Sequence, residues 1–117
     1  MRRKAGTLVP LELAICTAAA DLRQQGIDEF HGYLIAREIK EHADNRLLTA
    51  YGTLYRALAR LETMGMLSSR WEDAMVAAEE NRPRRRFYAL TTAGEEAVAE
   101  AARAAAEARA KKGWASA

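Results

Sequence analysis

Alanine makes up nearly half of the apolar residues, and this excess limits the core that the chain can build. Half of the 117 residues are hydrophobic, but 26 of these are Ala and only 32 are larger. That number of large apolar side chains suits one small domain of roughly 70–90 residues with an extension. It argues against a large enzyme with a deep enclosed cleft, and a second independent core is not expected.

The positive charges are unevenly distributed, although the formal net charge is only +2. Two stretches, residues 45–61 and residues 81–90, contain no acidic residue but several arginines: Arg46, Arg56 and Arg60 in the first, and Arg82, Arg84, Arg85 and Arg86 in the second. Such stretches are either solvated faces or two parts of one surface for an anionic ligand.

The sequence predicts a cytoplasmic protein without a disulfide or a membrane span. Cys16 is the only cysteine, and it cannot form an intrachain disulfide or a thiolate metal site. The basic residues 2–4 precede an apolar run, as in a secretory signal, but Glu12 interrupts that run and Ile15 is a poor match for a cleavage site. No apolar stretch reaches the length of about 18 residues that a transmembrane helix needs.

The sequence offers no set of residues for catalysis, for a metal or for another cofactor. Only Glu38 and His42 have facing helical spacing among the possible ligands, and two ligands are too few for a metal site. Neither a nucleophile with its base nor a glycine-rich phosphate loop is present. We therefore expect a protein that acts by binding.

Hydrophobic periodicity predicts three helices in the first half of the chain. The first begins at Pro10 and ends at Gly26, and the second runs from about residue 31 to about residue 45. The third opens at residue 49 or 50 and ends at Gly65. Its apolar stripe consists of Leu54, Ala57, Leu58 and Leu61. The opposite face carries small residues, hydroxyl groups and two arginines, so one side of this helix is buried and the other is exposed.

The sequence pattern of the second half of the chain predicts a β-hairpin followed by a long helix. Residues 67–72 and 85–90 are predicted strands, and residues 73–84 are predicted to form the loop between them. Thr92 and Glu95 have the spacing of a capping box, and residues 93–112 are good helix formers. The fold class is therefore mainly α with a small β-hairpin. We divide the chain into a basic arm (residues 1–8), a winged helix-turn-helix domain (residues 9–91) and a C-terminal dimerisation helix with its tail (residues 92–117).

This order of elements fits double-stranded DNA as the partner. A helix fits the major groove, small and hydroxyl residues permit close approach, and arginine contacts phosphates or guanine edges. The arginine-rich hairpin would reach the flanking backbone, with Arg85 turned inward or paired with an acid. The predicted DNA-binding residues are Thr49, Tyr51, Gly52, Thr53, Tyr55, Arg56, Arg60, Arg84 and Arg86.

Six segments form a recognisable series of motifs: residues 31–36 (HGYLIA), 51–58 (YGTLYRAL), 61–62 (LE), 69–72 (SRWE), 82–88 (RPRRRFY) and 90–94 (LTTAG). With these motifs the chain resembles the PadR family of bacterial transcriptional regulators, over roughly residues 9–95. The resemblance implies a homodimeric regulator, in most members a repressor, that binds palindromic operators. It also implies that a small aromatic or drug-like effector can release the DNA. The chain departs from the family at the apolar residues 74–78 and in its short, alanine-rich last helix, which resembles the short-tailed subgroup.

We expect the last helix to form the seam of a homodimer. Alanine permits close approach of two helices, and a two-fold dimer would hold two recognition helices about 34 Å apart. The predicted dimerisation residues are Leu11, Ile15 and Leu22 in the first helix and Ala97, Ala101, Ala104 and Ala108 in the last. The alternative function is a winged-helix module that binds another protein without specific DNA binding.

Overall fold

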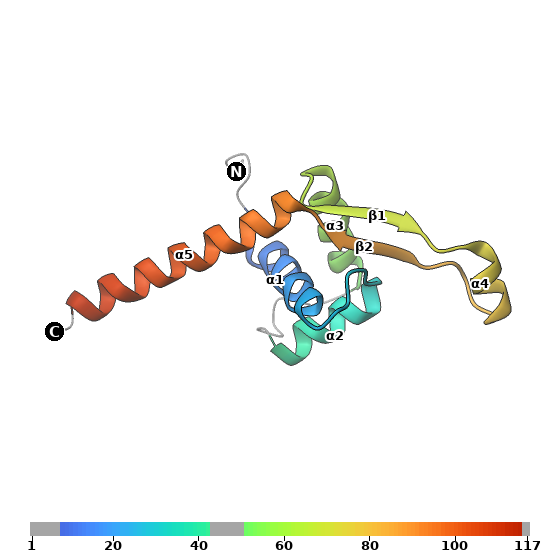
Figure 1. Ribbon diagram of the computed structural model, residues 1–117, viewed down its shortest axis with the longest axis horizontal. Coiled ribbons are helices and arrows are strands. Elements are labelled where there is room, and N and C mark those ends of the chain that lie inside the picture. Colours follow the sequence, from blue (N-terminus) through green and yellow to red (C-terminus); the bar gives the residue numbers. More distant parts are fainter. Residues whose placement is uncertain (1–7, 43–50, 116–117) are drawn as a thin grey trace.

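The computed structural model describes residues 8–42 and 51–115, and its elements follow the predicted order. These are α1 (Pro10–Gln24), α2 (Gly32–His42), α3 (Tyr51–Thr63), β1 (Leu67–Trp71), α4 (Ala74–Glu79), β2 (Arg86–Leu90) and α5 (Thr92–Ala115). The first three helices pack together, the hairpin extends from them on one side, and α5 extends on the other (Figure 1). The molecule is therefore elongated, with a longest extent of 62 Å.

The helical core forms where the hydrophobic periodicity predicts it. α1 starts at Pro10 and is followed by Gly26, whose φ of 87° is in the left-handed region that favours glycine. The predicted stripe of α3 is buried, and Leu54, Leu58 and Leu61 are completely inaccessible. These side chains share one core with the buried residues of α1 and α2, chiefly Ile15, Leu22, Ile35 and Ile39.

The wing, residues 67–90, is joined to the helical core through its second strand. β1 and β2 are antiparallel, with Leu67 opposite Leu90 and Trp71 opposite Arg86. Tyr88 and Phe30 exchange two backbone hydrogen bonds, of 3.0 and 2.8 Å, and their rings stack inside the core. The base of the wing is thereby fixed next to the start of α2.

The prediction of a loop throughout residues 73–84 is wrong, because the tip of the wing contains the short helix α4. Asp73 caps this helix, since its carboxylate accepts a hydrogen bond of 2.8 Å from the backbone N–H of Met75. Ala77 is buried under the tip, and its carbonyl accepts from the backbone N–H of Arg82. The apolar residues 74–78 therefore form an ordered helical turn.

α5 is anchored at its first turns and projects beyond them (Figure 1). The cap is Thr91 rather than the predicted Thr92: its hydroxyl accepts from the N–H of Gly94 and donates to the carbonyl of Gly65. Val98 packs against the core, whereas residues 102–113 are all exposed. The long helix thus has a docked half and a projecting half.

Candidate nucleic-acid interface

A cleft of about 540 Å³ lies where the start of α2, the exposed side of α3 and the wing meet. We call it the basic cleft, because its described lining carries four arginines and neither Asp nor Glu. The lining residues are His31, Gly32, Tyr33, Tyr55, Trp71, Arg82, Pro83, Arg84, Arg85, Arg86 and Tyr88. Arginines together with aromatic hydroxyl groups and a helix start are suited to a phosphate backbone.

The start of α2 faces the basic cleft with a neutral histidine. Nδ1 of His31 accepts a hydrogen bond of 3.3 Å from the backbone N–H of Leu34, so the imidazole caps the helix. Burial, and then the positive charges of Arg85 and Arg82, lower the pKa of His31. The first turn of α2 contains no acidic residue. The partial positive charge of the helix start is therefore not neutralised by a carboxylate of that turn.

Tyr55 lies against the start of α2 because residue 32 is a glycine. A Cβ atom at Gly32 would be 2.6 Å from the Tyr55 hydroxyl oxygen and 2.9 Å from the adjacent ring carbon. No larger residue leaves this space, so Gly32 allows the tyrosine to bridge α3 and α2. Tyr55 is nevertheless 49% exposed, and it is part of the lining of the basic cleft.

The predicted recognition face of α3 is on the surface. Gly52 and Arg56 are exposed, and Thr53 is half-buried. The guanidinium of Arg56 donates to the hydroxyl of Thr53 at 3.3 Å, and no acidic partner for it occurs in the described part of the chain. Thr49 and the side chain of Tyr51 lie outside the described residues.

Arg60 is on α3 but has an internal partner. Its Nε atom lies 3.0 Å from a carboxylate oxygen of Glu12 on α1, and the Glu12 side chain is only 3% exposed. Glu12 also accepts from the backbone N–H of Val9 at 3.1 Å. Arg60 therefore ties α3 to α1, a role that the helical periodicity did not reveal, and its predicted contact with DNA remains a prediction.

The arginines at the edge of the wing are arranged around one exposed tryptophan. The guanidinium carbons of Arg84 and Arg86 lie 5.8 and 5.0 Å from the centre of the Trp71 ring, within the range of cation–π attraction. Arg84 also donates to the carbonyl of Glu72 at 2.9 Å, and Arg86 lies 3.5 Å from a carboxylate oxygen of Glu62. The two predicted arginines are thus held in place on the cleft.

The two remaining arginines of this segment differ in their charge environment. Arg82 is paired with Glu72 at 2.5 Å and with Glu80 at 2.6 Å, so its charge is locally neutralised. Arg85 is exposed, and in the described ranges its guanidinium forms no salt bridge, although its backbone N–H donates to the Glu72 carboxylate at 3.2 Å. Arg85 is therefore better placed for an anion than Arg82. The expectation that Arg85 turns inward is wrong, because its side chain is exposed, whereas its charge does act on the carboxylate of Glu72 and helps to lower the pKa of that group.

Eight lining residues were not among the predicted site residues: His31, Gly32, Tyr33, Trp71, Arg82, Pro83, Arg85 and Tyr88. The first three belong to the HGY motif that supports the family resemblance, and this motif was the available signal. Trp71 is an exposed aromatic residue on a strand opposite Arg86, and only the strand pairing reveals its neighbours.

The predicted dimerisation residues fall into two groups. Leu11, Ile15 and Leu22 are buried in the core of their own chain, with Ile15 at 0% exposure, so these side chains are not available to a partner. Ala97 and Ala101 are half-buried, and Ala104 and Ala108 are fully on the surface. The projecting half of α5 thus remains as the candidate seam.

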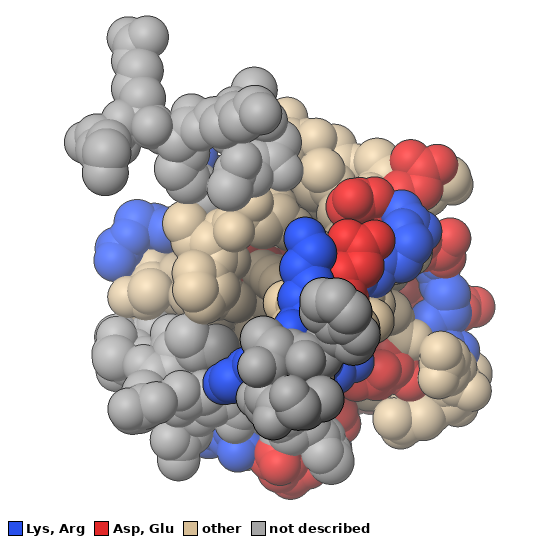
Figure 2. Space-filling model, turned by 90° about the vertical axis from the view of Figure 1, so that its left-hand side faces the viewer, with Lys and Arg blue, Asp and Glu red and all other residues tan. Residues whose placement is uncertain are grey.

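The end of the molecule at which α5 projects does not resemble the basic cleft. Seen from that end, basic and acidic side chains are intermixed in the described part of the surface (Figure 2). Among residues 8–42 and 51–115, no helix is long and apolar enough to cross a membrane. The same residues contain no group of His, Cys, Asp and Glu that could hold a metal ion.

Comparisons with known proteins bear on this arrangement. The model of the transcriptional regulator PadR-like family matches residues 22–100. A PadR family transcription regulator from Clostridium difficile is 19% identical, with 89% of this chain and 95% of that chain covered and a TM-score of 0.69. A PadR-like transcription factor from Bacteroides fragilis is 26% identical, with 88% and 86% covered and a TM-score of 0.68.

A third similar structure is a PadR family transcriptional regulator from Eggerthella lenta, 23% identical, with 88% and 84% covered and a TM-score of 0.59. The search among curated proteins gave no match. The predicted family and the predicted fold class, mainly helical with an antiparallel hairpin, are confirmed.

Proposed function

The chain belongs to the PadR-like family of transcriptional regulators, and from this premise we propose that it binds a specific site on double-stranded DNA. It would act in the cytoplasm as a repressor, by binding alone and without catalysis. α3 would enter the major groove, and the wing would contact the backbone beside it. The observation that carries this proposal is the basic cleft, which brings the start of α2, Tyr55 and the wing arginines together.

The charges and the shape of this surface support DNA as the ligand. The side chains of Arg56 on α3 and Arg85 on the wing are exposed, and neither guanidinium forms a salt bridge within the described residues. Gly52 and Thr53 have small side chains, which allow the helix to approach the base edges closely. Trp71 holds Arg84 and Arg86 on the same side, so the cationic groups are already oriented before binding.

The proposed regulator is a homodimer on a palindromic operator, assembled through the projecting half of α5. Residues 102–113 are exposed on all sides, and helices without tertiary packing are marginally stable in water. Ala104 and Ala108 lie one helical turn apart, so a second α5 can approach this face closely. The dimer would place two copies of α3 about 34 Å apart, one turn of DNA. A small aromatic or drug-like effector would control DNA release.

The test removes three cationic groups from the proposed surface. Operator fragments are first selected from genomic DNA with the wild-type chain. The triple variant Arg56→Ala, Arg84→Ala and Arg86→Ala should then bind these fragments at least about 100-fold more weakly. The slope of log affinity against log salt concentration should become shallower by up to about three. The matched control removes three exposed cations that lie outside the proposed surface, through Lys40→Ala on α2 and Arg103→Ala with Arg109→Ala on α5, and should keep most of the affinity. Full binding by the first triple variant would refute the proposed surface.

The tip of the wing favours a second candidate, a module that binds another protein. Met75 and Val76 of α4 are 70% and 43% exposed, and exposed apolar groups of this size are common in protein contacts. Binding to random duplex that disappears at modest salt, with no preferred site, would favour this candidate over the specific regulator.

A further inference from the structure

The direction of α5 depends on contacts at its first turns, because residues 102–113 are all exposed. The first contact is made at Thr91, whose N–H donates to the carbonyl of Met66 at 3.0 Å and whose hydroxyl donates to the carbonyl of Gly65 at 2.6 Å. A Cβ atom at Gly94 would collide with the carbonyl oxygen of Met66, so the helix starts directly against the turn before β1. This contact fixes the point at which α5 begins.

A second contact, which we call the α5 anchor, joins α5 to the end of α1 through Arg23. One terminal nitrogen of the Arg23 guanidinium donates to the carboxylate of Glu95, and the other donates to the carbonyl of Leu90 at 2.7 Å. An exposed ion pair alone contributes little. Here, however, the planar guanidinium donates in two fixed directions at once, to α5 and to the end of β2. The α5 anchor therefore consists of Arg23, Leu90 and Glu95.

The two contacts together determine the direction of the helix. The backbone contact at Thr91 holds the start of α5 as a pivot, and Glu95 lies about one turn further along. An open hollow of about 400 Å³ lies beside the α5 anchor, and Ala20 and Gln24 of α1 belong to its lining. This hollow leaves α5 space to swing relative to α1. The guanidinium of Arg23 therefore limits a motion that close packing at this point does not prevent.

α5 is long enough to convert a small rotation at the anchor into a large displacement at the proposed seam. Ala108 follows Glu95 by 13 residues, which correspond to about 20 Å along the helix. A rotation of about 10° would therefore move Ala108 by about 3.5 Å. Successive base pairs of DNA are about 3.4 Å apart, so this rotation is comparable to one base pair of half-site spacing.

We propose that Arg23 and Glu95 are positioning residues that set the direction of α5, and thereby the half-site spacing that the dimer accepts on its operator. The effect on spacing rests on the proposed function, because it requires a homodimer joined through α5. The direction of α5 is a property of the chain without DNA. Each of these two effects therefore has its own experiment.

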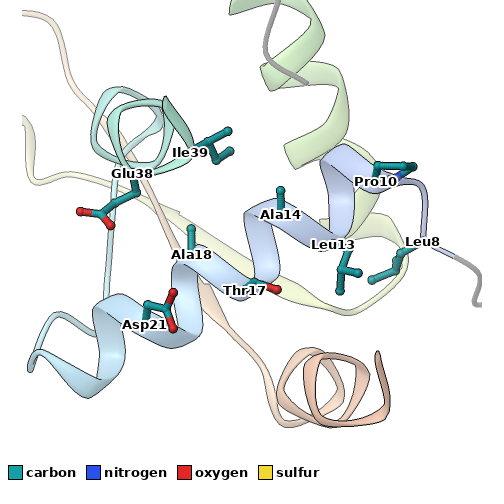
Figure 3. Close-up of a pocket in the computed structure, with 9 residues that line it drawn as sticks. All are labelled: Leu8, Pro10, Leu13, Ala14, Thr17, Ala18, Asp21, Glu38 and Ile39. Carbon is teal, nitrogen blue, oxygen red and sulfur yellow. The ribbon is translucent and has the colours of Figure 1, made fainter. Parts of the chain in front are cut away.

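Two neighbouring carboxylates provide matched controls for the α5 anchor. α1 lies between α2 and α5 (Figure 1), and Figure 3 shows Asp21 beside the open groove between α1 and α2, with Glu38 across from it. Asp21 is two residues before Arg23 and hence about 200° away around the helix. Glu96 follows Glu95 and is exposed. Asp21→Asn and Glu96→Gln remove one negative charge, as Glu95→Gln does, but leave the anchor intact.

The first experiment measures the direction of α5 in the full chain without DNA. Spin labels are attached at Lys40→Cys in α2 and Ala106→Cys in α5, both of which are exposed positions. Cys16 is replaced by Ala in the same chain, so that only these two positions are labelled. The labelled chain is diluted with an excess of unlabelled chain, and electron paramagnetic resonance then gives the distribution of label distances within one chain.

Removal of the anchor should widen the distribution of label distances. Arg23→Gln and Glu95→Gln should each increase its width at least about twofold, because α5 can then pivot on its first contact. Asp21→Asn and Glu96→Gln should leave the width unchanged. Thermal melting monitored by circular dichroism confirms that each variant is folded.

The second experiment measures the spacing preference on DNA. The two half-sites of the selected operator are rejoined by spacers that are one or two base pairs shorter or longer, and binding is followed by fluorescence anisotropy. The wild-type chain should prefer the native spacing. In Arg23→Gln and Glu95→Gln the ratio of affinities for native and altered spacings should fall at least about fivefold. Asp21→Asn and Glu96→Gln should keep the wild-type ratio.

Three results would overturn the inference. Unchanged label distances in both anchor variants would show that Arg23 and Glu95 do not set the direction of α5. A wider distribution with an unchanged spacing preference would show that this direction does not select the operator. An equal loss of affinity at every spacing would show that the anchor only supports the fold. If the wild-type chain selects no operator, the proposed function fails, and the label distances alone decide whether Arg23 and Glu95 set the direction of α5.

Discussion

Arg82 and Glu72 form a two-point ion pair below the tip of the wing, with the guanidinium nitrogens 2.5 and 2.7 Å from the two carboxylate oxygens. Glu72 also accepts a hydrogen bond of 3.2 Å from the backbone N–H of Arg85, and Arg82 also contacts Glu80. One carboxylate thus connects the end of β1 to the chain that returns from α4. These hydrogen bonds from Arg82 and Arg85 lower the pKa of Glu72 to about 2.

The ion pair predicts an acid-sensitive wing. The folded-state pKa of Glu72 lies below its ordinary value of 4.5. The carboxylate therefore stabilises the wing above pH 4.5, and this contribution is lost as the pH falls from 4.5 to about 2. Trp71 fluorescence, measured in a Trp114→Phe background, should report the loss of wing structure in that range. In Glu72→Gln this change of fluorescence between pH 4.5 and about 2 should disappear. Identical titration curves for the variant and for the protein with Glu72 would show that the ion pair does not stabilise the wing.

Two arginines of α3 should differ in what they support. Arg60→Ala leaves the buried carboxylate of Glu12 without its guanidinium and should lower the free energy of unfolding by about 2 kcal/mol. Arg56→Ala removes an exposed cation and should change that free energy by less than about 0.5 kcal/mol. It should weaken operator binding about tenfold. Urea denaturation measures the free energy of unfolding, and fluorescence anisotropy measures operator binding. Equal stability of both variants would mean that Arg60 does not tie α3 to α1.

The close approach of Gly32 and Tyr55 predicts a coupled effect on DNA binding. In Gly32→Ala the new methyl group would displace the tyrosine, whose exposed ring can swing outward. Folding should therefore be little affected, while operator affinity should fall about fivefold to tenfold as Tyr55 leaves the basic cleft. A double-mutant cycle with Tyr55→Ala provides the control, because Gly32→Ala should have almost no further effect once the ring is absent. If the two substitutions lowered the operator affinity additively, Gly32 would not act by positioning Tyr55.

Periodicity predicted the core of this fold because the apolar stripes are local features. The spacing of Leu54, Leu58 and Leu61 identifies the buried face of α3 without knowledge of what covers it. The same reasoning failed for α4, because a turn of six residues has little intrinsic stability. That turn depends on the Asp73 cap and on the burial of Ala77, and burial appears only when the two strands are paired.

The interface was predicted in part for a related reason. A helical projection places Arg56 and Arg60 on one face, but it does not show that Glu12, far earlier in the chain, takes one of them. An amphipathic α1 likewise does not tell whether its own chain or a partner covers Ile15 and Leu22. Long-range pairing decides both questions, and the sequence pattern of one element does not contain that information.

The projecting half of α5 predicts the oligomeric state. A chain that ends at Ala102 keeps Val98 and the docked half of the helix, so it should fold but sediment as a monomer. Ala104→Glu with Ala108→Glu should have the same effect in the full-length chain, because two carboxylates would face the seam. Ala106→Glu with Ala110→Glu, on the opposite side of the helix, should leave the dimer intact. Sedimentation velocity over a range of concentrations distinguishes these states. A dimer that survives both the truncation and the first pair of substitutions would place the seam elsewhere than the projecting half of α5.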